Sequence, residues 1–231
     1  VQRTDGAPIK RFEQIFERLF IDESQDLAGY DLDLIEMLMR SQVQIILVGD
    51  HRQATYATNS ASKNKKYRGA KIVDKFHQWE KAGLCALEYH NYSRRCVQAI
   101  CDFADQFHPD APNIESKNTN ISGHDGVFAV RKRDVSAYVE KFKPQTLRYS
   151  RATKDVVGRP LNFGAAKGMT FDRTIIYPHG PLKKFLSTGK LGDAGKEIDK
   201  IYVATTRARQ SVAFVVDNNA QLVGLNFYEP E

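Results

Sequence analysis

The stretch that decides the fold covers residues 18–26 and reads RLFIDESQD. It begins as a short buried strand, RLFI, and Asp22 and Glu23 follow the strand directly. Open α/β sheets bind their ligands at the carboxyl ends of the strands. Two carboxylates at this point therefore indicate a site, although a solvated acidic loop remains the alternative while the stretch is taken alone.

A second buried strand is predicted at residues 43–48, VQIILV, and it ends at Gly49 and Asp50. The segment that connects the two predicted strands is long enough for a crossover between parallel strands. Residues 28–41 predict a helix within it, with an apolar face formed by Leu34, Ile35, Leu38 and Met39.

Parallel strands end at one edge of a sheet, so the side chains that follow them should lie close together. Here these are Asp22, Glu23, Asp50 and Gln53. A glutamine in this position can hydrogen-bond a terminal phosphate or the water that attacks it. A simple turn at the strand end is the alternative for Asp50 and Gln53.

The rest of the chain alternates between helical stretches and strands, a pattern typical of a mostly parallel sheet. Residues 60–71 carry five basic residues and no acid, which predicts a surface loop. An extended loop is predicted at 108–126. Helices are expected at 71–82, 95–107 and 194–208, and strands at 127–131, 146–149, 174–177 and 212–216.

The composition excludes some classes of protein. No run of about 18 apolar residues occurs, so a membrane-spanning helix is not expected. The cysteines are Cys85, Cys96 and Cys101, an odd number without a C-x-x-C pair, which favours reduced thiols in a cytoplasmic protein. A net charge of +6 favours a polyanionic partner, but only weakly.

Five segments, in this order, resemble the motifs of UvrD/Rep-like superfamily 1 DNA helicases. The first two, DESQD at 22–26 and GDHRQATY at 49–56, match the family's D-E-x-Q-D and G-D-x-x-Q-x-x-Y. The others are NYSRRC at 91–96, GAAKGMTFD at 164–172 and VATTRAR at 203–209. Together they span nearly the whole chain.

The resemblance implies a RecA-like parallel sheet with flanking helices. Residues 1–88 would be part of a first RecA-like domain, and residues 89–231 a second such domain without a large accessory insertion. The interval between Arg95 and Lys167 leaves room for only two strands and a loop.

The resemblance also implies roles in ATP hydrolysis. Asp22 would hold Mg²⁺ through water, because this ion prefers oxygen ligands, and Glu23 would act as general base. Arg207 and Arg95 would stabilise the γ-phosphate from across a cleft between the domains, with Arg94 as the alternate to Arg95. The alternative for Arg207 is a helix-surface arginine.

Further candidate residues would contact nucleotide or DNA. Asp50, Lys167 and Gly168 are candidates on the nucleotide side; Gly168 and Lys167 could also meet the DNA backbone, with Asp172 a weaker candidate. Tyr56 could stack on a base, unless it is a core tyrosine. The remaining DNA-binding candidates are Lys63, Lys65, Lys66 and Thr170.

The sequence departs from the family in its phosphate-binding loop. No G-x-x-x-x-G-K-[ST] motif occurs, although the backbone amides and lysine of this loop hold the phosphates in P-loop NTPases. We interpret this as a missing Walker A region, to be supplied in cis or in trans after a cut or a natural split. Position 58, often aromatic in relatives, is Thr58, and Thr170 replaces the usual glutamate.

The expected function is therefore a fragment of an ATP-dependent DNA helicase or translocase that moves on single-stranded or partly duplex DNA. Alone, the chain should hydrolyse little ATP. The alternative is a catalytically retired module that binds DNA or protein. A nuclease lacks support, because no additional acidic cluster accompanies a strand-bound lysine.

Overall fold

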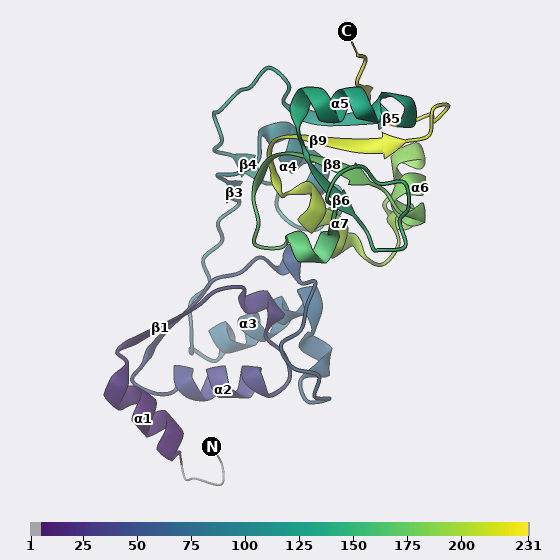
Figure 1. The fold of residues 1–231 in the computed structure, drawn as a ribbon. Coiled ribbons are helices and arrows are strands. Elements are labelled where there is room, and N and C mark those ends of the chain that lie inside the picture. The colour runs from purple at the N-terminus through teal and green to yellow at the C-terminus, as the bar shows by residue number, and fades with distance from the viewer. Residues whose placement is uncertain (1–5, 231) are drawn as a thin grey trace. The chain divides into compact units, whose positions relative to one another are not determined.

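The computed structural model describes residues 6–230, which form two compact units divided between Tyr89 and His90 (Figure 1). The division falls one residue from the boundary expected from the sequence. Among the described residues, no helix is long and apolar enough to cross a membrane.

The first unit is built around two parallel strands, β1 and β2, which pair Phe20 with Ile46. Its elements are α1 (Ala7–Ile15), β1 (Arg18–Ile21), η2 (Ser24–Asp26), α2 (Tyr30–Met39), β2 (Gln44–Leu47), η3 (His51–Gln53), η4 (Lys65–Tyr67), η5 (Gly69–Lys71) and α3 (Ile72–Lys81).

The core of this unit lies between one face of the two strands and the helices. Alternate strand residues pack against it, because successive side chains of a strand point to opposite faces. These are Leu19, Ile21, Ile45 and Leu47, and the buried core residues are Leu32, Ile35, Leu38, Tyr67, Ile72 and Trp79.

Three expectations for the first unit were wrong in part. The two strands are not buried, because only one face of them packs against the core, and Phe20 on the other face is 65% exposed. Leu34 is exposed, and Leu32 lies in the core with Ile35 and Leu38, because packing on the strands sets the phase of α2. The basic segment 60–71 is not entirely a surface loop. Tyr67 is buried, and its hydroxyl donates a hydrogen bond to Gln78 at 2.7 Å.

The second unit contains a six-stranded parallel sheet in the order β10-β5-β9-β8-β6-β7. Its elements are β3 (Tyr92–Ser93), α4 (Gln98–Asp105), β4 (Glu115–Ser116), β5 (Gly126–Arg131), η6 (Lys132–Asp134), α5 (Val135–Phe142), β6 (Gln145–Arg148), β7 (Leu161–Asn162), η7 (Phe163–Ala166), β8 (Phe171–Tyr177), α6 (Gly180–Thr188), η8 (Leu191–Ala194), α7 (Ile198–Thr205), β9 (Ala208–Val216) and β10 (Asn226–Phe227).

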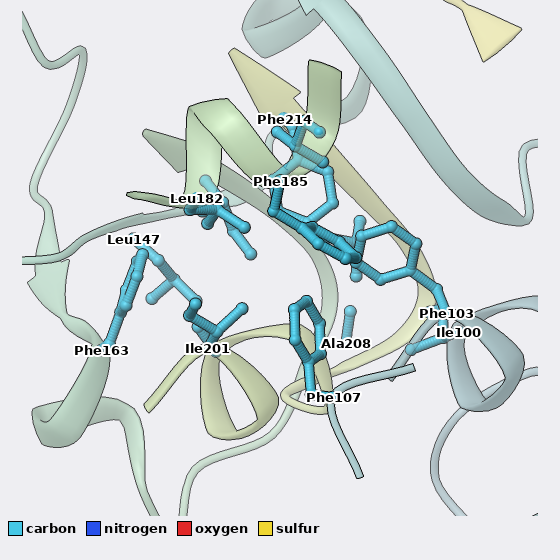
Figure 2. Close-up of a cluster of buried hydrophobic side chains, with 14 of the residues drawn as sticks. Ile100, Phe103, Phe107, Leu147, Phe163, Leu182, Phe185, Ile201, Ala208 and Phe214 are labelled. Carbon is cyan, nitrogen blue, oxygen red and sulfur yellow. The ribbon is translucent and has the colours of Figure 1, made fainter. Parts of the chain in front are cut away.

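Helices cover both faces of this sheet, as parallel sheets require. On one face an aromatic core joins α4, α6 and α7 to the strands, and Figure 2 shows Phe103, Phe107, Phe185 and Phe214 gathered there. On the other face Tyr138 of α5 packs with residues of β5, β8 and β9.

Most expected elements of the second unit are present, with shorter helices than the sequence suggested. Two short helices, α5 and α6, were not expected, and β4 lies within the predicted loop 108–126. The interval from Arg95 to Lys167 therefore holds helices α4 and α5 as well as strands, so the expectation of two strands and a loop was wrong.

Candidate functional site

The turn after β1 presents the first two candidate residues in an uncommon conformation. Glu23 has φ 53° and ψ 38°, in the left-handed region, and its backbone amide donates to Asp22 Oδ1 at 2.8 Å. A non-glycine residue in this region is uncommon and is frequently associated with a functional site. The turn leaves the Asp22 side chain exposed and Glu23 half-buried.

A continuous chain of hydrogen bonds joins Glu23 to Gln53. The side-chain amide of Gln25 donates to the Glu23 carboxylate, and its oxygen accepts from the Asp50 backbone amide at 3.0 Å. Asp50 Oδ2 then accepts from Gln53 Nε2 at 2.9 Å. The structure thus brings together Asp22, Glu23, Asp50 and Gln53, as we expected from the positions of these residues after the two strands.

Gly49 makes this close approach possible. A Cβ atom at this position would lie 2.4 Å from Gln25 Oε1 and 2.6 Å from Ser24 Oγ. In addition, the Ser24 backbone amide donates to the Val48 carbonyl at 2.9 Å. The two turns are therefore packed too tightly for any side chain larger than that of glycine.

Asp50 is an ionised anchor within this network. Burial favours its neutral form, but the charge of Arg52 and hydrogen bonds from Gln53 and Arg52 hold its pKa below the usual value. Arg52 Nε lies 3.0 Å from Asp50 Oδ1. Both carboxylate oxygens of Asp50 thus accept hydrogen bonds from the protein, and one of these bonds orients Gln53.

Gln25, Arg52 and Gly49 also belong to the site, although none of them is among the candidates from the sequence. All three lie within the motifs at 22–26 and 49–56, and this position in the motifs is the sequence signal that indicates them. A buried side-chain amide needs hydrogen-bond partners, and Gln25 has them in both turns. Gln25 is 2% exposed and Arg52 is 8% exposed.

Tyr56 is 67% exposed, so the alternative of a core tyrosine is wrong. Thr58, the position that is often aromatic in relatives, donates its hydroxyl to the Asp26 carbonyl at 3.1 Å. The tyrosine ring of this motif is therefore exposed, and position 58 adds no second ring beside it.

The lysines of the basic segment differ in their surroundings. Lys63 forms an ion pair with Asp33 at 2.7 Å, so its charge is partly neutralised. Lys65 and Lys66 are exposed, and the Lys66 ammonium lies 4.8 Å from the centre of the Tyr67 ring.

In the second unit, the Arg207 guanidinium lies against the end of α7 and is 1% exposed. Its Nε donates to the Val203 carbonyl at 3.0 Å, and its Nη2 donates to Thr206 Oγ1 at 3.2 Å. A cation is favoured beside the carbonyls that end a helix. The alternative of a surface arginine is therefore wrong.

Arg95 joins Arg207 at the same residue. Its Nη1 donates to the Thr206 carbonyl at 3.1 Å, whereas Arg94 is exposed with its guanidinium 5.4 Å from the centre of the Tyr92 ring. Of the two alternatives, Arg95 thus belongs to the arginine pair.

The segment between η7 and β8 passes beside this pair. The Met169 carbonyl lies 3.5 Å from Arg207 Nη1, and Gly168 has φ 78°. Lys167 is half-buried and Thr170 is exposed. Asp172 pairs with Arg209 at 3.1 Å, with its carboxylate largely exposed.

The described residues contain no group of three or more side chains that could hold a metal ion. Mg²⁺ fits Asp22 nevertheless, because this ion usually keeps several waters and binds through one or two carboxylates plus substrate phosphates. The Asp22 side chain is exposed at the end of β1, so it would be available to such an ion.

In fold, the chain resembles the RecA-like domains of viral helicases. The structure of the PRRSV helicase is 21% identical with a TM-score of 0.50, and the alignment covers 92% of this chain and 37% of that chain. Arterivirus nonstructural protein 10 (helicase) in complex with DNA is 20% identical with a TM-score of 0.51, covering 90% and 41%. The chain thus spans about two fifths of the length of these proteins.

In sequence, residues 4–71 match the family model of the UvrD/REP helicase N-terminal domain. This match includes the acidic turn, Gly49 and Gln53. No curated protein matches the chain. Residues 4–71 are therefore similar in sequence to the N-terminal domain of UvrD/REP helicases, and the chain has the fold of helicase domains.

Proposed function

We propose that this chain is part of an ATP-dependent DNA helicase or translocase, in which ATP hydrolysis drives movement along single-stranded DNA. The observation that carries the proposal is the hydrogen-bonded chain from Glu23 through Gln25 and Asp50 to Gln53. A general base and a residue that orients water must be held in fixed geometry. These hydrogen bonds would hold Glu23 and Gln53 in that way.

In the proposed reaction, Glu23 accepts the proton of the attacking water, and Gln53 hydrogen-bonds that water or the terminal phosphate. Asp22 would hold Mg²⁺ through water, and this ion would neutralise charge on the phosphates. Arg95 would stabilise the charge that develops on the transferred phosphoryl group. Arg207 is 1% exposed, so it would take part only after its guanidinium leaves the Val203 carbonyl. In related reactions such an arginine accelerates turnover by roughly 10³–10⁵-fold.

DNA is the proposed partner. Tyr56 offers an exposed ring, and Lys65 and Lys66 offer positive charge in the same unit. Lys63 would contribute less, because it pairs with Asp33. Thr170, Lys167 and Gly168 remain candidates in the second unit, for DNA or nucleotide.

The sequence contains no Walker A motif. We therefore propose that the 231-residue chain alone hydrolyses little ATP and needs a phosphate-binding loop in cis or in trans. Isothermal titration of the isolated chain with Mg²⁺–ATP should show weak binding. Binding at micromolar concentration or tighter would contradict this requirement.

The catalytic assignment is tested in a protein that joins residues 1–231 to a Walker A segment. DNA-stimulated ATP hydrolysis should be lost in Glu23→Gln, because the amide cannot accept the proton. Glu17→Gln, the same chemical change at an exposed position of the same unit, should leave turnover unchanged. Turnover that persists in Glu23→Gln would contradict the role of Glu23.

A catalytically retired module that binds DNA or protein is the second candidate, and the missing Walker A motif favours it. The same experiment separates the two functions. Salt-sensitive DNA binding without any DNA-stimulated ATP hydrolysis in the joined protein would support the retired module.

A further inference from the structure

Arg95 lies in a segment, residues 94–97, that joins β3 to α4 and has little regular structure of its own. Side chains therefore hold its backbone. Ser93 Oγ accepts hydrogen bonds from the backbone amides of Arg95 and Cys96, at 3.2 and 3.1 Å. These bonds shape the turn but do not attach it to the sheet.

Part of the attachment to the sheet comes from the segment after β4. Asn118 Nδ2 donates to the Arg95 carbonyl at 2.7 Å and to the Arg209 carbonyl at 3.2 Å. Asn118 thus bridges the arginine-bearing turn and the start of β9, two residues after Arg207. The orientation of its amide is consistent, because Oδ1 accepts the Asn120 backbone amide at 2.9 Å.

Neighbouring contacts strengthen the same junction. Ser116 Oγ donates to the Cys96 carbonyl at 2.7 Å, and the Val97 backbone amide donates to the Arg209 carbonyl at 2.9 Å. The segment that carries Arg95 is therefore fixed by Asn118 and Ser116 on one side and by β9 on the other.

We propose that Asn118 is a positioning residue: through its two carbonyl contacts it holds the Arg95 segment against β9, and so fixes the Arg95 guanidinium beside Thr206 and Arg207. The inference rests on the proposed function. A guanidinium that stabilises a transition state must be placed in advance, since a displacement of about 1 Å can cost roughly 10²-fold in rate.

The test uses the ATP-hydrolysing protein that contains residues 1–231. Asn118→Asp keeps the shape of the side chain but removes both donors and sets a carboxylate against two carbonyl oxygens. It should lower kcat for ATP about tenfold or more, with a smaller change in KM. Asn120→Asp makes the same charge change at an exposed position two residues away, and should leave kcat unchanged.

A double-mutant cycle separates positioning from a purely structural role. In an Arg95→Ala background, Asn118→Asp should lower kcat by less than about twofold, because residues that act through one another are not additive. Additive losses would overturn the inference. If Asn118→Asp does not fold, as judged by circular dichroism, Asn118→Ala and Ser116→Ala carry the same cycle and the same expectations.

The outcomes also distinguish this inference from the proposed function. Loss of turnover in Glu23→Gln with unchanged kcat in Asn118→Asp would overturn the positioning role alone. Turnover that persists in Glu23→Gln would overturn the proposed function, and with it the role of Asn118.

Discussion

At the scale of single residues, Gly49 shows how one position can hold two motifs together. Only glycine fits at this position, because the Gln25 and Ser24 side chains occupy the volume that a Cβ atom would take. The Gln25 contacts that link Glu23 to Asp50 depend on this approach.

Replacing Gly49 with alanine should therefore destabilise the first unit. Overpacking of this kind costs about 1–3 kcal/mol. Fluorescence of Trp79, the only tryptophan of the chain and a core residue of this unit, measures the effect during urea unfolding.

Gly192→Ala is the matched control, because a Cβ at Gly192 has no neighbour within 4 Å and its backbone needs no left-handed conformation. The Trp79 transition should be the same in this variant as in the unchanged chain. Equal transitions in Gly49→Ala would show that the two turns can separate at no cost.

Truncation of Arg95 and of Arg207 should lower the stability of the second unit by different amounts. Arg207→Ala removes a buried guanidinium that donates to the Val203 carbonyl, and an unsatisfied buried group costs about 1–3 kcal/mol. Arg95→Ala should cost less, because Arg95 is only half-buried. Urea unfolding of the 231-residue chain, followed by circular dichroism, measures both changes. A larger loss in Arg95→Ala would contradict the order.

At the scale of elements, the His124 ring links the segment before β5 to α5. It lies between Phe128 and Phe142, with ring centroids 4.1 and 4.0 Å away, and its Nε2 lies 3.1 Å from the Tyr138 hydroxyl. Burial, and then the nearby charge of Arg173, lower the pKa of His124 to about 4.

This lowered pKa predicts a pH dependence of stability. An unfolded histidine has a pKa of about 6.5, so between about pH 6.5 and pH 4 the unfolded chain binds a proton that the folded chain does not. The contribution of His124 to stability is thus complete above this range and is lost as the pH falls through it. Urea unfolding at several pH values measures the loss.

His124→Phe is the informative variant, because a phenyl ring can stack between Phe128 and Phe142 but cannot be protonated. Its unfolding free energy should decline less steeply than that of the unchanged chain between about pH 6.5 and pH 4. Identical slopes for the two proteins would show that His124 takes no proton on unfolding.

At the scale of the whole molecule, the net charge of +6 weakly favours a polyanionic partner such as nucleic acid. The lysines of the basic segment 60–71 should contribute unequally to DNA binding. Lys65 and Lys66 are exposed, whereas Lys63 pairs with Asp33. A lysine that already has a carboxylate partner releases fewer counterions when it meets a phosphate.

Changing Lys65 and Lys66 to glutamine should therefore reduce the salt dependence of single-stranded DNA binding. This slope of log K against log salt is negative, and its magnitude should decrease by about 0.7 for each lysine that contacts a phosphate, and by less for Lys63→Gln. Fluorescence anisotropy of a labelled oligonucleotide at several salt concentrations measures it.

Lys183→Gln with Lys184→Gln on α6 changes the net charge by the same amount and serves as the control. Those lysines pair with Asp217 and Asp193. A slope that falls equally in the control would show an effect of net charge alone, and an unchanged slope in the Lys65 and Lys66 variant would exclude phosphate contacts there.

The sequence alone predicts the α/β class of fold and the segments that form β1 and β2. The strands β1 and β2 follow from short apolar runs, and the turns that follow them are bound to meet because parallel strands end at one edge. It also identified Arg95 and Arg207 as candidates through their resemblance to family motifs.

The partners of individual side chains could be seen only in the folded chain. In the structure Leu32 rather than Leu34 lies in the core, and Tyr56 is exposed. Arg95 rather than Arg94 contacts Thr206 beside Arg207. The structure also revealed Asn118, whose partners Arg95 and Arg209 are distant from it in sequence. The physical reason is that periodicity and spacing are local properties, whereas burial and hydrogen-bond partners are set by contacts between segments far apart in the chain.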